Sequence, residues 1–226
     1  MSDFLYEVNG VPFWREADII LREQFIAVIT RELQDVLADI NPAWRWFRVE
    51  APVLTPTDLL HEQYSSGDGV YRVNGVLALR PETTMGSYAY ARYLLGPASK
   101  GIRLPIVVWQ AGKSFRKEQD QPTKFVRLKE FWQAEYQMLY SPDTKCDYAE
   151  RVIPRVAAIL GAEVGPCEVV PSDRIPAYSE RTVDVEHDGL ELCSISQRTD
   201  FEGARNLEVA IGLDRCVVAY RKAGVM

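Results

Sequence analysis

The stretch SFRKEQDQPTKFVRLKEFWQAEYQ, from Ser114 to Gln137, decides the fold prediction, because it reads as two strands joined by a short basic loop. Side chains alternate across a strand with period two, so one face of this hairpin collects charged, polar and aromatic groups. These groups are Ser114, Arg116 and Glu118 on the first strand, and Arg127, Lys129, Phe131, Gln133 and Glu135 on the second. Charged groups on a sheet face are costly to bury without a ligand. The hairpin therefore predicts a nucleotide-binding surface.

Length and composition limit the class of protein. The chain has 226 residues, of which 47% are hydrophobic and 26% charged, which predicts one domain over residues 1–226 with a substantial core. No apolar run approaches the roughly 18 residues needed to span a bilayer, and the N-terminus lacks a signal-peptide pattern, so no membrane partner is expected. The four cysteines are widely separated, which argues against a disulfide framework or a zinc site and favours a cytoplasmic protein.

The charge is unevenly distributed along the chain. A formal net charge of −6 argues against a protein that coats nucleic acid non-specifically. Between Ser99 and Lys129, however, eight basic residues accompany only Glu118 and Asp120. Either a solvated basic surface or a polyanion-binding surface explains this bias, and its overlap with the hairpin favours the second. Because the chain contains only two histidines, a histidine-based catalytic triad or metal site is not expected.

The order of predicted elements indicates an α+β fold. Helical spacing of apolar residues and runs of β-formers, bounded by turn signals, mark the elements. Helices are predicted over 15–40, 81–95, 148–160 and 211–222; strands over 46–54 (interrupted by Pro52), 106–118, 168–170, 182–185 and 191–198; and a hairpin over 71–79 around Asn74-Gly75. The strands come mainly as hairpins rather than in regular β-α-β alternation. We therefore expect a largely antiparallel sheet flanked by helices.

Two further places carry oxygen ligands. Glu82 lies where a strand is predicted to end and a helix to begin, so it either stabilises the first helical turn or holds an ammonium group. Glu191 and Ser194 lie on a predicted strand and offer hard oxygen atoms suited to Mg²⁺ at phosphates. A surface charge is the alternative explanation for Glu191.

The last helix begins with an unusual charge. Gly212 precedes the helix and lets the backbone approach a ligand closely, and Arg215 lies in the first helical turn. A cation there is unfavourable for the helix dipole. Either a polyphosphate or the neighbouring carboxylates of Asp214 and Glu208 are expected to offset it.

In this order and spacing, the segments resemble the three signature motifs of the class II aminoacyl-tRNA synthetases. Pro52 after the long helix resembles the first motif, an interface element; FRKE at 115–118 with Arg127 and Phe131 resembles the second; GLDR at 212–215 resembles the third. LRPETTMGSY (79–88) and VRLKEFWQAE (126–135) are similar to the glycine enzyme, and ELCSISQRTDFEGAR (191–205) to the glycine and serine enzymes. The resemblance covers residues 15–223 and implies a class II synthetase-like catalytic domain.

The resemblance implies a role for each matching residue. Arg116 contacts the α-phosphate of ATP, Phe131 stacks beneath the adenine and Glu118 helps to hold it. Arg127 and Arg215 grip the terminal phosphates. Arg116 and Arg215 are therefore the catalytic candidates in an attack of the amino-acid carboxylate on the α-phosphorus. The resemblance also places Mg²⁺ on Glu191 and Ser194, and the amino group of the amino acid on Glu82, Gln133 and Glu135.

The partners follow from the same resemblance. The chain ends shortly after Arg215, so no anticodon-binding domain is expected, and a tRNA acceptor stem would dock on loop 119–126. A carrier protein or small molecule is the alternative acceptor, and the amino acid is left open because Val209-Ala210 stands where the glycine enzyme has Pro-Ser. A homodimer is expected through the first helix and the Pro52 strand. The rival hypothesis is a non-catalytic paralogue that acts as a nucleic-acid-binding or regulatory subunit.

Overall fold

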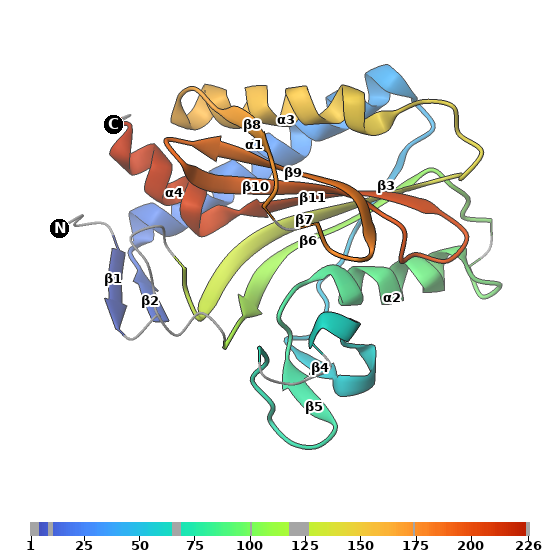
Figure 1. The fold of residues 1–226 in the computed structure, drawn as a ribbon, viewed down its shortest axis with the longest axis horizontal. Helices are drawn as coiled ribbons and strands as arrows, with labels where there is room; N and C mark the ends of the chain where they lie inside the picture. Colours follow the sequence, from blue (N-terminus) through green and yellow to red (C-terminus); the bar gives the residue numbers. More distant parts are fainter. Residues whose placement is uncertain are drawn as a thin grey trace.

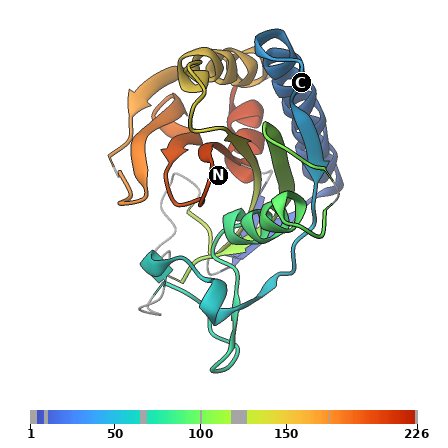
Figure 2. The ribbon, with the colours of Figure 1, turned by 90° about the vertical axis from the view of Figure 1, so that its right-hand side faces the viewer.

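A seven-stranded sheet forms the centre of the molecule, in the strand order β3-β6-β7-β11-β10-β9-β8 (Figures 1 and 2). The computed structural model describes residues 5–8, 11–64, 69–99, 101–117, 127–173 and 175–224. The strands of this sheet are β3 (Arg45–Arg48), β6 (Ile106–Phe115), β7 (Glu130–Tyr140), β8 (Glu168–Pro171), β9 (Ser179–His187), β10 (Leu190–Arg198) and β11 (Arg205–Gly212). The β3–β6 pair is parallel and every other pair is antiparallel, which confirms the α+β, largely antiparallel prediction.

The deciding stretch does form an antiparallel pair. Strands β6 and β7 pair with Ser114 opposite Phe131 and Ala111 opposite Ala134. On β7, Ala134 and Tyr136 belong to the main hydrophobic core, whereas Phe131, Gln133 and Glu135 line a cavity on the other face. Period-two alternation therefore separates an apolar face from a ligand-type face, as the sequence predicted.

Three helices cover the apolar face of the sheet (Figures 1 and 2). They are α1 (Glu16–Ile40), α3 (Tyr148–Val164) and α4 (Leu213–Lys222). Along α1, buried apolar residues recur at helical spacing, as Phe25, Ile29 and Leu33 show, and they pack into the main core. Burial of this continuous apolar surface is the main driving force for the fold.

The opposite face is only partly covered. Helix α2 (Thr84–Leu95) packs across one end of the sheet, with Tyr88 and Leu94 against Val108. Below it lies a small unit built from β4 (Leu54–Pro56) and β5 (Leu77–Leu79), with single 3-10 turns at Thr57–Leu59 and Glu62–Tyr64 (Figure 1). We call the described residues 54–64 and 69–79 the cap segment. A separate two-stranded ribbon, β1 (Leu5–Val8) and β2 (Val11–Trp14), precedes α1.

Several predicted boundaries were wrong. The strand predicted over 46–54 divides: β3 ends at Arg48 and β4 begins at Leu54 in a different sheet, with exposed Pro52 between them. Proline donates no ladder hydrogen bond, so the chain leaves the sheet before it. The helix predicted from residue 81 begins at Thr84, which places Glu82 before the helix rather than in its first turn.

The strand β11 was missed in the sequence, although it is central to the sheet. It lies between β7 and β10, with Leu207, Val209 and Ile211 in the main core. The residues between them, such as Glu208 and Ala210, line the cavity. Apolar and polar residues do alternate along this segment. Because it leads directly into the last helix, the segment was interpreted as part of that helix motif rather than as a strand.

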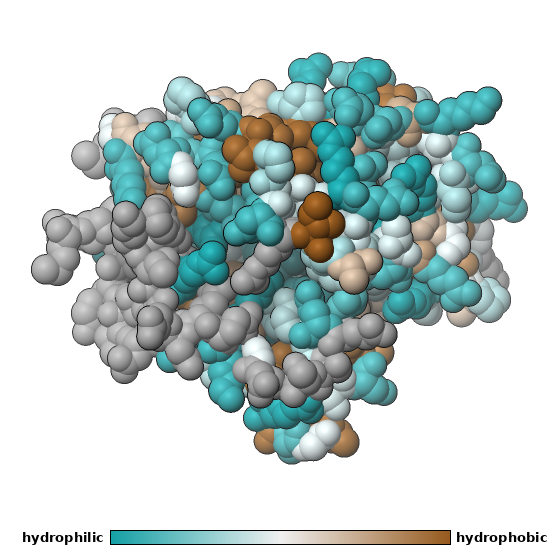
Figure 3. Space-filling view, viewed as in Figure 1, coloured by the Kyte–Doolittle hydropathy of each residue, from teal (hydrophilic) through white to brown (hydrophobic). Residues whose placement is uncertain are grey.

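Where its residues are described, the face drawn in Figure 3 is mainly hydrophilic. From the side drawn in Figure 1, hydrophobic residues occur singly or in small groups (Figure 3). Single exposed apolar residues are ordinary in folded proteins. Among the described helices, none is both long and apolar enough to cross a membrane.

Candidate active site

A cavity of about 970 Å³ lies over the uncovered face of the sheet. Its floor is a band of polar side chains that crosses the strands in register. Ala210 of β11 lies between Glu135 of β7 and Ser194 of β10, and Asp184 of β9 follows. The next row contains Gln137, Glu208, Ser196 and Thr182. Including its other lining residues, such as Glu82 and Ser194, the cavity brings together side chains that are more than 100 residues apart in the sequence.

Every sequence-predicted site residue that the structure describes lines this one cavity. These residues are Glu82, Arg116, Arg127, Phe131, Gln133, Glu135, Glu191, Ser194 and Arg215. Glu118 and the loop 119–126 lie outside the described residues. Four separate sequence segments thus meet at one cavity.

One wall of the cavity contains the Arg116 guanidinium packed against the Phe131 ring. The Arg116 guanidinium carbon lies 5.3 Å from the centre of the Phe131 ring, and its Nε donates to the carbonyl oxygen of Pro81 at 3.1 Å. Cation–π contact and the hydrogen bond hold the guanidinium at the cavity wall. Arg127 is exposed in the segment that precedes β7. This wall can receive a planar base and a phosphate.

Arg215 pairs with a residue that the sequence did not assign to it. Its Nη1 donates to the backbone oxygen of Glu191 and forms an ion pair with Glu191 Oε1, each at 3.0 Å. The sequence offered Asp214 or Glu208 as the protein groups that offset Arg215. Asp214 instead accepts from the Trp132 backbone N–H at 2.9 Å, and Glu208 pairs with Arg198.

A bulge places Glu191 and Ser194 on the same cavity. Residues three apart on a regular strand point to opposite faces. The pairing of β10 with β9 shifts register between Glu191 and Cys193, so one extra residue is inserted and both oxygen ligands reach the cavity. The bulge therefore reconciles the two predicted metal ligands with strand geometry.

The residues around this bulge fit a hard divalent cation. Asp184 lies directly across from Ser194 on β9, and its Oδ1 is buried without a hydrogen-bond partner among the described residues. Burial raises the pKa of Asp184, and hydrogen bonds from Ser172 and Ser194 oppose that rise. Carboxylate and hydroxyl oxygens are ligands that Mg²⁺ accepts. Within the described part of the chain, no group of three or more His, Cys, Asp or Glu side chains is placed to hold a metal by itself.

The other end of the cavity is acidic and buried. Glu82 and Glu135 are 7% and 3% exposed. Glu135 accepts from the hydroxyls of Thr83 at 2.6 Å and Thr84 at 2.9 Å, and from the Gln133 amide. Burial, with the nearby charges of Glu208 and Glu82, raises the pKa of Glu135 to about 8. Burial also raises the pKa of Glu82, whose Oε1 has no hydrogen-bond partner among the described residues. A cation bound here would relieve the cost of both carboxylates.

A buried arginine holds the Glu82 segment against the sheet. Arg80 Nε donates to the Lys113 carbonyl at 2.7 Å, and Nη1 donates to the Ala51 carbonyl at 2.6 Å and to Gln110 Oε1 at 3.3 Å. Its Nη2 lies 2.3 Å from where a Cβ on Gly112 would be. Arg80 therefore crosses β6 at a point where only glycine leaves room.

Sequence reasoning missed a closed ring of hydrogen bonds beneath the acidic end. Arg198 donates to Glu208 at 3.0 Å and to Asp200 at 2.6 Å, and Tyr88 donates to Asp200 at 2.9 Å. The ring is completed by Asn206, which donates to Tyr88 and Gln137, and by Gln137, which donates to Glu208. Most polar groups of this ring satisfy one another at low local dielectric, and among the described residues Asn206 Oδ1 is the exception, buried without a hydrogen-bond partner. The available signal was the polar phase of β11, at Asn206 and Glu208.

Comparisons with known proteins agree with this geometry. No protein-family model matches the chain. The chain is 33% identical over 141 residues to a "Glycine--tRNA ligase" of Cutibacterium acnes, and this alignment covers 57% of the chain and 29% of the relative. It is 27% identical over 155 residues to the same ligase of Ureaplasma urealyticum, covering 64% and 32%. The chain thus spans less than a third of the length of these curated relatives.

Solved structures match more of the chain. A prolyl-tRNA synthetase of Cryptosporidium parvum, complexed with halofuginone and AMPPNP, superimposes with a TM-score of 0.75 at 15% identity, covering 96% of this chain and 49% of the other. A pyrrolysyl-tRNA synthetase of Desulfitobacterium hafniense superimposes with a TM-score of 0.66 at 20% identity, covering 92% and 70%. At these identities the likeness establishes the fold.

Proposed function

Because the chain has the catalytic-domain fold of the class II aminoacyl-tRNA synthetases, we propose that it uses ATP to activate an amino acid and transfers the aminoacyl group to an acceptor. The amino-acid carboxylate would attack the α-phosphorus, release pyrophosphate and leave an aminoacyl adenylate. Such a reaction needs no protein nucleophile. Positioning and electrostatic stabilisation carry most of the rate, and the cavity is rich in groups suited to both.

We assign the ATP end to the wall that contains Arg116 and Phe131. Phe131 offers a ring face for the adenine, and Arg116 neutralises charge that develops at the α-phosphate. Arg127 and Arg215 bind the terminal phosphates. Arg215 must then either keep its ion pair with Glu191 while it binds phosphate or break that ion pair. Glu118 keeps its assignment to the adenine, and it lies outside the described residues.

Glu191 and Ser194 would hold Mg²⁺, with Asp184 as a further oxygen donor. Both predicted ligands reach the cavity through the β10 bulge, and the unpartnered Asp184 Oδ1 lies on the adjacent strand. A divalent ion held there would supply neutralisation of the phosphate charge.

The amino acid would bind at the acidic end. The observation that carries this assignment is Glu82 Oε1, a buried carboxylate oxygen without a hydrogen-bond partner among the described residues, in the same cavity as the ATP wall. An ammonium group supplies the missing donor and charge. Glu135 would be a second acceptor. Gln133 already donates to Glu135, so its role becomes orientation of that carboxylate.

The acceptor is proposed to be the acceptor end of a tRNA or a non-tRNA group such as a carrier protein. Relatives named as tRNA ligases support the first. The basic loop 119–126, where docking was predicted, lies outside the described residues. Assembly as a homodimer is also proposed, and the exposed Val53 and Leu54 beside Pro52 support it. The non-catalytic alternative is less well supported, because the candidate ATP, metal and amino-acid residues all converge on one cavity.

An ATP–pyrophosphate exchange assay across all proteinogenic amino acids, glycine first, tests the proposal. Exchange that depends on one amino acid and on Mg²⁺ is the expected result. Absence of exchange with every amino acid, together with measurable RNA binding, would favour the non-catalytic alternative.

A further inference from the structure

The acidic end of the cavity is enclosed by residues from two distant parts of the chain. From the cap segment, Gln63 Nε2 lies 3.5 Å from Glu82 Oε2, and the Tyr64 side chain also hydrogen-bonds to Glu82. From the segment before β9, Tyr178 hydrogen-bonds to Gln63. Gln63 thus spans from Glu82 to Tyr178 across the end of the cavity.

Tyr178 is held firmly in this position. The Arg198 guanidinium carbon lies 4.0 Å from the centre of its ring, and the His61 ring packs edge-on at 4.4 Å. Its backbone oxygen accepts from both the N–H and the hydroxyl of Thr199, at 2.8 and 3.0 Å. Arg198 is itself fixed in the hydrogen-bonded ring, so the wall behind Tyr178 has little freedom to move aside.

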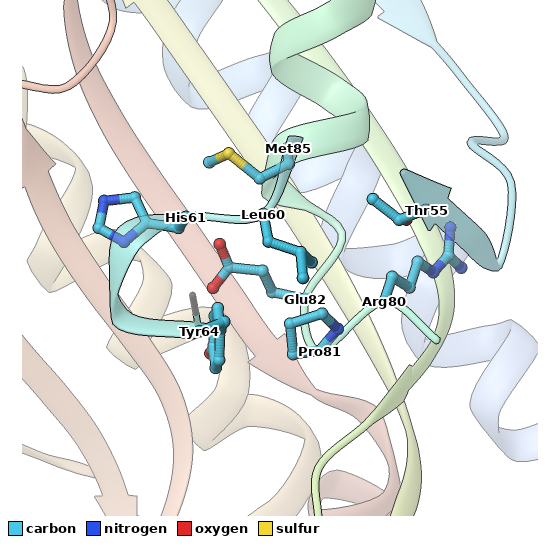
Figure 4. Close-up of a pocket in the computed structure, with 8 residues that line it drawn as sticks. All are labelled: Thr55, Leu60, His61, Tyr64, Arg80, Pro81, Glu82 and Met85. Carbon is cyan, nitrogen blue, oxygen red and sulfur yellow. The ribbon is translucent and has the colours of Figure 1, made fainter. Parts of the chain in front are cut away.

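The small pocket behind Glu82 offers no open volume for a substrate side chain. A small pocket is lined there by Leu60, Tyr64, Arg80, Pro81 and Met85, among others (Figure 4). The Glu82 carboxylate extends away from Arg80 toward His61 and Tyr64 (Figure 4). The pocket has no room for even one water molecule. A side chain directed past Glu82 would therefore meet packed protein.

We infer that Gln63 and Tyr178 close the amino-acid end and restrict the substrate to the smallest side chains, with Gln63 as the specificity-determining residue. This inference rests on the proposed function and adds the substrate class to it. The ammonium group would sit at Glu82 and Glu135, and Gln63 would occupy the volume that a larger side chain requires. Tyr178 would form the rigid backing of the wall.

Exchange kinetics in wild type and in Gln63→Ala test the inference. The assay compares kcat/KM for glycine, alanine, serine and leucine at saturating ATP. Wild type should prefer glycine or alanine over leucine. One methylene in a hydrophobic pocket changes kcat/KM by about 10–200-fold, and the low end of that range applies to this more polar wall, so Gln63→Ala should raise the ratio for serine over glycine by about 10-fold. The KM for ATP should not change. Gln63 is exposed, so its truncation should not impair folding.

Gln34→Ala is the matched control, since it makes the same change on the exposed side of α1. An unchanged amino-acid preference in Gln63→Ala would overturn the inference while leaving amino-acid activation intact. So would a wild-type preference for leucine. Absence of exchange with every amino acid would overturn the proposed function as well.

Discussion

Replacing Glu208 by Gln isolates the charge that the hydrogen-bonded ring contributes. The substitution keeps the shape of the side chain, and the remaining oxygen can still accept from the Gln137 amide. It removes the negative partner of Arg198, whose side chain is only 1% exposed.

The expected loss follows from opposing effects. Removing one partner of a buried ion pair costs about 3–5 kcal/mol. Two features reduce this loss: Arg198 keeps its contact to Asp200, and the repulsion of Glu208 on Glu82 and Glu135 disappears. We therefore expect the free energy of unfolding to fall by about 2 kcal/mol, which is about 0.8 M in urea midpoint at an m-value near 2.5 kcal/mol/M.

The pH dependence gives a second readout. The folded-state pKa of Glu135, about 8, lies above its ordinary value of 4.5, so folding retains a proton that the unfolded chain releases. The stability from this proton is fully present below pH 4.5 and is lost as the pH rises toward 8. Because the charge of Glu208 is one cause of the raised pKa, the loss should be smaller in Glu208→Gln.

Urea titrations of wild type and variant at several pH values between 5 and 9 provide the measurement. Glu180→Gln is the control, since Glu180 pairs with Arg205 at 2.9 Å on the surface, where such pairs contribute at most about 1 kcal/mol. The reasoning would be refuted if both variants lost equal stability at pH 7. It would also be refuted if Glu208→Gln lost stability with pH as steeply as wild type.

Three further predictions concern the proposed function. Arg116→Ala should lower the exchange rate by at least about 100-fold and leave the melting temperature unchanged, since the residue serves a ligand; unfolding of that variant without ligand would indicate a structural role. Glu191→Gln should raise the Mg²⁺ concentration needed for half-maximal exchange by at least about 10-fold, and an unchanged requirement would remove Glu191 from the metal site. Light scattering at micromolar concentration should give about twice the chain mass of 25.7 kDa, whereas a monomeric mass would contradict the dimer.

The hairpin could be predicted from the sequence, and so could the grouping of the candidate site residues in one cavity. Phe131, Gln133 and Glu135 differ by two, so the period of a strand places them on one face whatever the rest of the fold does. Glu191 and Ser194 shared a cavity only because of a bulge, which alternation alone does not reveal. The resemblance to family motifs, rather than strand periodicity, led to that pair.

The remaining contacts of the site could not be predicted from the sequence, because they join residues that are far apart in the chain. The Arg215–Glu191 pair and the ring that joins Tyr88 to Asp200 link residues that are 24 and 112 positions apart. Many carboxylates were available to each cation, and only the strand order decides which one is near. Gln63 and Tyr178 gave no local signal at all, because their role depends on how the cap segment folds back over the sheet.

The crossing of Arg80 over Gly112 constrains how this sequence can evolve. The guanidinium is tied to Lys113, Ala51 and Gln110, so it cannot swing away from a new side chain at low cost. A residue with a Cβ at position 112 would displace the Arg80 guanidinium at the cost of these hydrogen bonds, whereas a change at position 80 first would remove that cost. The order of two substitutions is therefore fixed by one contact. Lineages that keep the arginine are expected to keep the glycine, whatever ligand the cavity binds.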